Sequence, residues 1–223
     1  MPLAPVILKP HEPVAERVLL PGDPGRALRL ATQLIDGPRM LNHHRGLWGY
    51  SGPASDGAPL TIQSTGLGGP SAAAVVAELV LLGARRLVRV GTAAGIGATA
   101  LGALIVVDAA LAGDGASRAL GAGERVEADS QLADALARGG SQRGLVASVD
   151  LHDPARSTTW SDAGVLACDL ATAAVLAAAQ HHGAAAGALL AITRAQGERL
   201  ADAALEPLEA ALGAAGAAAL GAI

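Results

Sequence analysis

The sequence predicts an α/β fold whose largely parallel sheet is covered on both faces by helices. Short apolar segments rich in Val, Leu and Ile alternate with longer alanine-rich segments along the chain. Glycine-containing turns separate many of these segments. Strands that alternate with helices in this way are typical of parallel sheets, because each helix connects neighbouring strands across one face.

The predicted elements follow from this pattern in chain order. The predicted strands are residues 17–20, 60–65, 86–90, 103–107, 145–149, 165–168 and 188–192. The predicted helices are residues 25–35, 71–83 and 129–138, an alanine-rich segment after residue 168, and residues 200–220. The polar, glycine-rich segment 114–125 is expected to be a surface excursion, and its glycine content would permit motion.

The composition indicates one domain with a core of small side chains. The chain has 223 residues, 51% of them hydrophobic, but no Phe, one Tyr and two Trp. This length suits one large α/β domain, so we expect residues 1–223 to form a single domain. With 29 glycines and abundant alanine, we expect helices and strands to approach each other closely.

The charge and the cysteine content favour a small-molecule partner. The formal net charge is −4, which gives neither a basic field for nucleic acid nor a Lys/Arg run suited to a membrane surface. One cysteine gives no disulfide framework, and the first residues lack the pattern of a secretory signal. The apolar stretches are interrupted before about twenty residues, so we expect no membrane span and a cytoplasmic protein.

Three predicted strands end in residues suited to binding an anion. Ligands of open α/β sheets lie beyond the carboxyl ends of the strands. Glycine lets backbone N–H groups approach an anion, and arginine matches phosphate oxygens with a planar fork. These residues are Gly22 and Arg26, then Gly66, Gly68 and Gly69, then Arg89, Gly91 and Thr92. Each group alone is weak evidence, but Arg89 stands in the apolar run LVRV, where an unpaired guanidinium is costly, so we expect an anion to meet it.

Four segments together resemble the nucleoside phosphorylase-I family, the bacterial purine nucleoside and uridine phosphorylases. They are VLLPGDPGRA, NHHRGLWGYSG, STGLGGPSAAAVVAELVLLGARRLVRVGTA and GVLACDLATA, and the resemblance runs from Val14 to Ile192. It implies a three-layer α/β/α fold around a twisted, partly barrel-like sheet. It also implies homodimers assembled as a trimer of dimers, a hexamer with sites shared between subunits.

The reaction that the resemblance implies is phosphorolysis, with inorganic phosphate as co-substrate and no cofactor. Phosphate attacks the anomeric carbon of a nucleoside, releasing the base and (deoxy)ribose 1-phosphate. The implied phosphate-binding residues are Gly22, Arg26, Arg89 and Thr92, with Arg45 reaching the site of the neighbouring subunit. The implied ribose-binding residues are Thr92, Leu170 and Ala171. The implied base-binding residues are Ala93, Ala94, His152, Cys168, Asp169 and Arg194, and catalysis would fall to Arg26, Arg89 and Arg194.

The chain departs from the family pattern in its ribose half. The family has Glu-Met-Glu where this chain has Asp169-Leu170-Ala171, and the second Glu accepts hydrogen bonds from the 2′- and 3′-hydroxyls. Alanine cannot, and each such bond is worth about 1.5 to 3 kcal/mol. A histidine that the family lends to the neighbouring ribose site falls near Val6, with His11 as the local substitute.

The base-reading positions differ as well. An aromatic residue that stacks on the base aligns with His152, for which a solvated loop histidine is an equal alternative. A late Asp or Asn aligns with Thr193 or Arg194. Arg194 could donate to a base carbonyl, as an arginine does in uridine phosphorylases, although a guanidinium with a pKa above about 12 is a poor general acid. The base therefore stays open between purine and pyrimidine.

Two further residue types have simple interpretations. Cys168 lacks the neighbours that a nucleophilic cysteine needs, so a role as pocket wall is favoured. The pairs His43-His44 and His181-His182 have no third ligand in the sequence, and we predict no metal.

Three functions are compatible with these residues. The first is an active nucleoside phosphorylase with altered ribose or base recognition. The second is a catalytically impaired paralogue that keeps the anion pocket and the oligomer. The third, a hydrolytic nucleosidase, has no need of a phosphate site, and the complete anion set counts against it.

Overall fold

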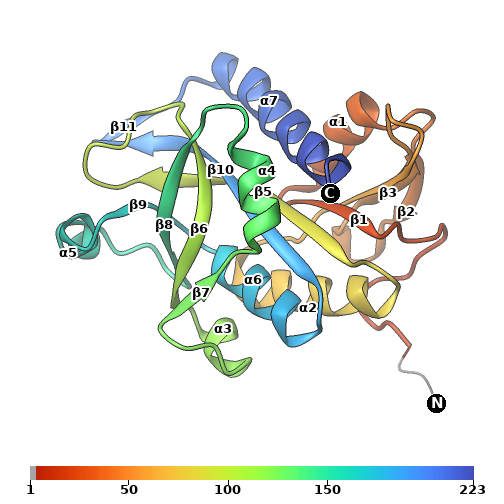
Figure 1. Cartoon of the computed structure of the whole chain (residues 1–223), viewed down its shortest axis with the longest axis horizontal. Coiled ribbons are helices and arrows are strands. Elements are labelled where there is room, and N and C mark those ends of the chain that lie inside the picture. Colours follow the sequence, from red (N-terminus) through yellow and green to blue (C-terminus); the bar gives the residue numbers. More distant parts are fainter. Residues whose placement is uncertain (1–3) are drawn as a thin grey trace.

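Apolar side chains alternate in direction along the first strand, and this alternation builds a core on each face of the sheet. In β1 (Arg17–Pro21), Val18 and Leu20 belong to one core and Leu19 to the other. Successive side chains of a strand point to opposite faces, so a strand buried on both sides is apolar throughout. The computed structural model, which describes residues 4–223, shows the sheet enclosed between two helical layers (Figure 1).

The strands form one mixed sheet that partly closes on itself. Its order is β11-β10-β6-β8-β9-β5-β1-β4-β3-β2, with β7 on β6 and an added pairing of β10 with β5. Five strands form a closed ring through the pairings β5–β10, β10–β6, β6–β8, β8–β9 and β9–β5. The remaining strands are β2 (Arg39–Asn42), β3 (Gly49–Pro53), β4 (Pro59–Gln63), β5 (Arg86–Gly95), β6 (Leu104–Gly113), β7 (Arg125–Glu127), β8 (Gln142–Val149), β9 (Val165–Asp169), β10 (Ala185–Ala195) and β11 (Glu198–Arg199). The predicted partly barrel-like α/β sheet is thus confirmed.

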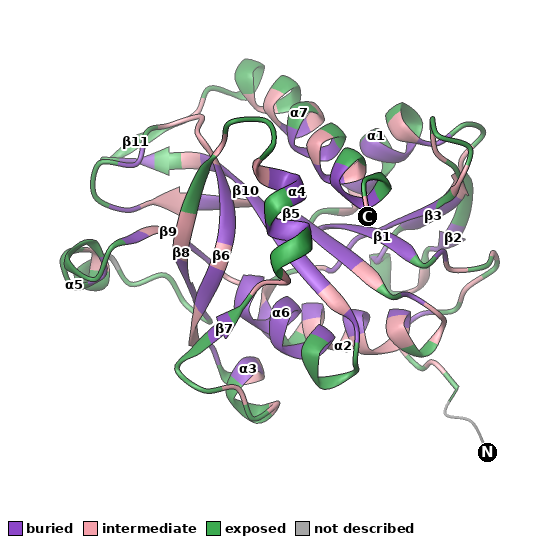
Figure 2. Ribbon diagram, in the orientation of Figure 1, coloured by how far each residue is buried: buried purple, intermediate pink, exposed green. Residues whose placement is uncertain are grey.

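The helices divide between the two faces. α1 (Pro24–Leu34), α4 (Ser130–Ala137) and α7 (Asp202–Gly221) lie on one face, and α2 (Gly68–Leu81), α3 (Gly115–Ala119) and α6 (Thr172–His181) on the other (Figure 1). α5 (Ser157–Asp162) lies apart, near β9. The inner sides of the helices and the central strands are buried, whereas the outer sides of the helices are exposed (Figure 2).

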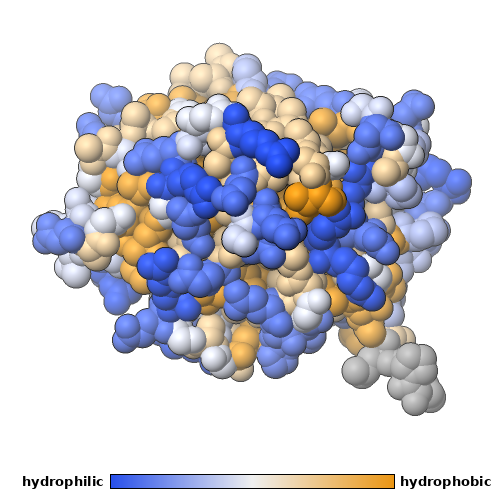
Figure 3. Space-filling model, in the orientation of Figure 1, coloured by the Kyte–Doolittle hydropathy of each residue, from blue (hydrophilic) through white to orange (hydrophobic). Residues whose placement is uncertain are grey.

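Glycines on α7 confirm the expected close approach of helices and strands. A Cβ at Gly216 would lie 2.6 Å from Leu19 of β1, and one at Gly213 would meet Leu30 of α1 still more closely. α7 is long and apolar enough to cross a membrane by length and composition alone. In this fold it covers the sheet, with Leu212 and Leu220 buried, and hydrophilic and hydrophobic residues intermix over this side of the molecule (Figure 3).

The structure extends and corrects the predicted elements. Each predicted strand and helix is present, but the antiparallel strands β2, β3, β7 and β11 were not predicted, because they are short and either polar or glycine-rich. The segment 114–125 is not a free excursion. It begins with α3 and ends in β7, and Asp114 and Ser117 are fully buried through a helix cap, with Ser117 N donating to Asp114 Oδ1 (2.8 Å).

Candidate active site

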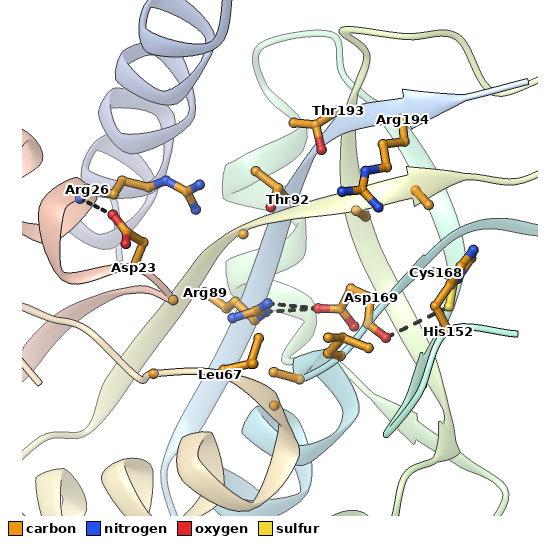
Figure 4. A pocket seen from close by; sticks show the side chains of 18 of the residues that line it. Asp23, Arg26, Leu67, Arg89, Thr92, His152, Cys168, Asp169, Thr193 and Arg194 are labelled. Carbon is orange, nitrogen blue, oxygen red and sulfur yellow. Dashed lines mark hydrogen bonds and ion pairs between the residues drawn. The ribbon is translucent and has the colours of Figure 1, made fainter. Parts of the chain in front are cut away.

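A cavity of about 510 Å³ opens at the carboxyl ends of the central strands (Figure 4). The sequence-predicted residues that line it are Gly22, Arg26, Gly66, Gly68, Arg89, Gly91, Thr92, Ala93, Ala94, His152, Cys168, Asp169, Leu170, Ala171, Thr193 and Arg194, joined by Asp23, Pro24 and Leu67. These residues come from α1, α2, β5, β9, β10 and the loops beside them, including the loop between β1 and α1. The fold therefore gathers in one place residues that lie as far apart in the sequence as Gly22 and Arg194.

The helices α1, α2 and α6 begin beside this cavity, and they differ in whether a side chain caps their first backbone N–H groups. Asp23 caps α1 by accepting from Arg26 N (2.7 Å), and Asp169 accepts from Thr172 N (3.1 Å) at the start of α6. α2 begins after Leu67, which provides no side-chain cap. The first N–H groups of a helix have no partner within the helix, so the start of α2 is the end that offers donors to an anion.

Arg89 of β5 is held by a carboxylate from the same chain. Its NH2 donates to Asp169 Oδ2 (2.9 Å), and its Nε lies 3.2 Å from that oxygen and 3.1 Å from Thr172 Oγ1. Gly91 provides the space, because a Cβ there would lie 2.8 Å from Arg89 NH2. The anion expected beside this buried arginine is thus Asp169 in the first instance.

Asp169 is fully engaged by groups of the protein. Its Oδ1 accepts from Ser148 Oγ (2.6 Å), and its Oδ2 accepts from Thr172 Oγ1 (2.7 Å) in addition to Arg89. The residue is 4% exposed. Each carboxylate oxygen already has several donors, so the arrangement favours a role in fixing Arg89 over the base contact predicted for Asp169.

Arg26 of α1 is held in a similar way, by a carboxylate of α7 in the same helical layer. It lies on the buried face of α1, and its NH2 donates to Glu209 Oε1 of α7 (2.5 Å). The other oxygen, Oε2, accepts from Arg29 NH2 (2.5 Å). That hydrogen bond is the main reason that the pKa of Arg29 is raised above its usual value. Both arginines of the anion end are therefore anchored by buried carboxylates.

Two guanidinium nitrogens at this end of the cavity remain without a partner. Arg26 Nε and Arg89 NH1 are buried and have no hydrogen-bond acceptor among residues 4–223. A buried N–H without an acceptor loses the free energy of its hydration, about 1 to 3 kcal/mol and more for a charged group. Both nitrogens belong to side chains that line the cavity, so an anion bound there would lie beside these unpartnered groups.

The middle of the cavity is apolar and its far end is cationic. Leu170, Ala171 and Cys168, from β9 and the turn after it, line this part together with Ala93 and Ala94 of β5. Arg194 and Thr193, at the end of β10, border the cavity beyond them, as Figure 4 shows. Within residues 4–223, Arg194 takes part in no ion pair, so its charge is available to a ligand.

Cys168 is expected to be unreactive in the folded protein. It is 3% exposed, and burial, with the neighbouring charge of Asp169, raises the pKa of its thiol to about 12. A raised pKa keeps the sulfur protonated at every pH below about 12, and the thiol is a poor nucleophile.

Iodoacetamide at pH 8 should therefore label Cys168 much more slowly in the native protein than in the unfolded protein. The extent of labelling would be measured by intact-mass spectrometry. Complete labelling of native protein at the unfolded rate would contradict the assignment of Cys168 as a wall residue.

Four predicted contributors lie outside this cavity. Gly69 is buried away from it, and a Cβ there would lie 2.8 Å from Asp114 Oδ1. Arg45 is exposed, with left-handed backbone (φ 58°) in a short 3₁₀ turn. Its contribution to a neighbouring subunit stays a prediction. Val6 is 70% exposed with its N–H bound to Glu78 Oε1 (2.7 Å), and His11 stacks on His43 with ring centroids 5.5 Å apart. His152 does border the cavity, on an exposed loop.

A metal site would require side chains that could bind the ion together. Residues 4–223 contain no group of three or more His, Cys, Asp or Glu side chains placed to hold a metal ion. The pair His181 and His182 makes an edge contact, with ring centroids 4.9 Å apart.

Sequence reasoning missed Ser148, Thr172 and Glu209. Ser148 and Thr172 carry no distinctive motif, and their roles appear only when β8, β9 and α6 meet. Glu209 did carry a signal. It lies three residues before Leu212 and seven before Gly216, on the stripe of α7 that is buried. A carboxylate on the buried stripe of a helix requires a cationic partner elsewhere in the fold.

Comparison with known proteins agrees with this geometry. A family model described as the phosphorylase superfamily matches residues 16–222. The DeoD-type purine nucleoside phosphorylase of Geobacillus kaustophilus is 31% identical over 192 residues, covering 81% of this chain and 81% of that protein. The uridine phosphorylase of Treponema pallidum is 37% identical over 106 residues, 47% of this chain and 40% of that protein.

A shorter match and a solved structure complete the picture. The DeoD-type purine nucleoside phosphorylase of Exiguobacterium sp. is 44% identical over 84 residues, and the match spans 37% of this chain and 35% of that protein. The crystal structure of uridine phosphorylase from Vibrio fischeri ES114 complexed with 6-hydroxy-1-naphthoic acid superimposes with a TM-score of 0.85 at 25% identity, over 94% of this chain and 93% of that chain. A second crystal structure of uridine phosphorylase from the same organism gives a TM-score of 0.84 at the same identity and coverage. The matched range, the identity over most of the chain and the shared fold have one explanation: the chain belongs to the phosphorylase superfamily.

Proposed function

We propose that the protein is a nucleoside phosphorylase that cleaves the N-glycosidic bond of a nucleoside with inorganic phosphate. The observation that carries this proposal is the anion end of the cavity. There Arg26 and Arg89 are fixed from behind by carboxylates while Arg26 Nε and Arg89 NH1 lack acceptors among the described residues. The uncapped start of α2 borders the same space.

The reaction would proceed from this end of the cavity. Phosphate, bound by Arg26, Arg89, Gly22 and Thr92, is held with one oxygen aimed at the anomeric carbon of the sugar. A bond forms between that oxygen and the carbon as the bond to the base breaks, and the base leaves with the electron pair. Fixed guanidinium groups stabilise the phosphate without reorganising, and positioning lowers the barrier further. The products are the free base and the sugar 1-phosphate.

The opposite end of the cavity suits a base that carries a carbonyl group. Arg194 can donate hydrogen bonds to a carbonyl oxygen and stabilise the negative charge that the departing base acquires. A guanidinium does not give up its proton at neutral pH, so the leaving nitrogen takes its proton from water. This favours uracil-, thymine- or hypoxanthine-type bases over bases with an exocyclic amino group at that position.

The same cavity supports one alternative. The apolar floor at Leu170 and Ala171 offers no carboxylate to the sugar hydroxyls, which is the observation that favours a catalytically impaired paralogue. Such a protein would bind phosphate without turnover. The oligomer with Arg45 shared between subunits, and the cytoplasmic location, belong to this proposal as predictions.

A panel of nucleosides tests the proposal. Purine and pyrimidine nucleosides, each as ribo and 2′-deoxy forms, would be incubated with the enzyme and phosphate, and free base would be measured by liquid chromatography. We expect release of carbonyl-bearing bases. No release from any nucleoside, with inorganic phosphate still binding by calorimetry, would instead support the impaired paralogue.

A further inference from the structure

Glu209 lies behind the anion end of the cavity and joins two arginines that differ in their surroundings. Its side chain is 4% exposed. Arg26 lines the cavity, whereas the side chain of Arg29 is 42% exposed and does not line it. Each arginine donates to a different oxygen of Glu209, at 2.5 Å in both cases. One carboxylate thus connects a cavity arginine to a solvent-facing one.

The position of Glu209 is set by the tight packing of α7. Gly213, one helical turn later, lies so close to Leu30 of α1 that no side chain fits between them. Leu30 is one turn after Arg26 on the same buried face of α1. The two helices therefore meet with Glu209 directly opposite Arg26, and the carboxylate has little freedom to move away.

We propose that Glu209 is a positioning residue for phosphate binding, acting through Arg26. An arginine side chain has many rotamers and loses them when it binds an anion. Because Glu209 already holds NH2, the guanidinium of Arg26 is fixed before phosphate arrives, extending from α1 toward Thr92 as Figure 4 shows. Because the Arg26 side chain lines the cavity, its remaining N–H groups are then available to the anion. This role rests on the proposed phosphorylase function.

A merely structural role would give a different result. If Glu209 only joined α1 to α7, its loss would lower the thermal midpoint and reduce the active fraction without changing any Michaelis constant. A positioning role changes the KM for phosphate selectively, because the nucleoside contacts other parts of the cavity.

The test is Glu209→Gln, which keeps the size of the side chain and removes its charge. We expect the KM for phosphate to rise about tenfold while the KM for the nucleoside stays the same. Arg29→Gln is the matched control, because it removes the other hydrogen bond of Glu209 outside the cavity. Its phosphate KM should equal that of the wild type. An unchanged or lower phosphate KM in Glu209→Gln would overturn the proposal.

A double-mutant cycle tests whether the effect passes through Arg26. The dissociation constant of inorganic phosphate would be measured by calorimetry for Arg26→Ala with and without Glu209→Gln. We expect the second change to have no further effect in the Arg26→Ala background, since coupled residues are not additive. The same weakening in both backgrounds would contradict the proposal.

Two further measurements keep the outcomes separate. If Glu209→Gln does not fold, Glu209→Asp retains the charge on a shorter side chain, and we expect it also to raise the phosphate KM. A wild type that neither binds phosphate nor releases base would refute the phosphorylase function itself. A wild type with normal turnover and a Glu209 variant with wild-type phosphate KM would refute only the positioning role.

Discussion

Arg89→Ala is expected to lower kcat/KM for phosphate by a factor of about 10² to 10³, which is the usual effect of removing one fixed donor from a charged transition state. Arg89 is fixed in the site by hydrogen bonds to Asp169 and Thr172, and it occupies the space that Gly91 leaves free. The loss is measured by initial rates of base release at varied phosphate concentration. A decrease of less than threefold would contradict the place of Arg89 at the anion end.

The same change should also destabilise the protein. Without Arg89, Asp169 is a buried carboxylate that has lost its cation, and breaking a buried pair in this way costs about 3 to 5 kcal/mol. Adding Asp169→Asn removes the unpaired charge, so the double variant should recover part of the stability in urea unfolding but none of the activity. Arg86→Ala is the control, because Arg86 begins the same strand and does not line the cavity.

The enzyme is expected to cleave 2′-deoxynucleosides with a kcat/KM about tenfold or more above that of the ribonucleosides. The floor of the cavity at Leu170 and Ala171 is apolar, and the oxygens of Asp169 are already bonded to Arg89, Ser148 and Thr172. A buried hydroxyl without an acceptor costs about 1 to 3 kcal/mol, and 1.4 kcal/mol is a factor of ten. A 2′-deoxy sugar has one such hydroxyl fewer. Equal kcat/KM values for the two sugars would contradict the expectation.

Ala171→Glu tests the same position from the other side. It places a carboxylate where the family resemblance implies one, and we expect it to raise kcat/KM for ribonucleosides toward or above that for the deoxy forms. Ala171→Gln is the matched control, with nearly the same shape and no charge, and should give a smaller gain. If Ala171→Glu folds and gains no activity on ribonucleosides, Ala171 is not what limits the use of ribose.

Local sequence patterns were sufficient to predict the central framework. Alternation of apolar segments and glycine turns placed β1, β4, β5 and the helices that follow β1 and β4, because these elements are apolar, regular and buried. The edge strands β2 and β11 were not predicted, since a strand of two to four residues is defined by its partner in the sheet more than by its own sequence. The helix α3 inside the segment 114–125 depends on the burial of Asp114, which is a property of tertiary structure.

The candidate site was predictable as a set of residues but not as a network. Gly22, Arg26, Arg89, Thr92 and Arg194 were all singled out from the sequence, and they line one cavity. The sequence did not indicate that Asp169 would hold Arg89, or that Glu209 would hold Arg26. Both pairs join residues at least 80 positions apart. Pairings at that separation depend on how β5 meets β9 and how α1 packs on α7, and they leave little trace in local composition.

The identity of the phosphorus-containing product tests the central claim most directly. A nucleoside from the panel would be incubated with the enzyme in buffer with and without inorganic phosphate, and followed by ³¹P nuclear magnetic resonance and base release. We predict that a sugar 1-phosphate resonance grows in step with the free base, one molecule of each, and that neither forms without phosphate. Release of base at the same rate in phosphate-free buffer, with no new phosphate ester, would show a hydrolase and contradict the account.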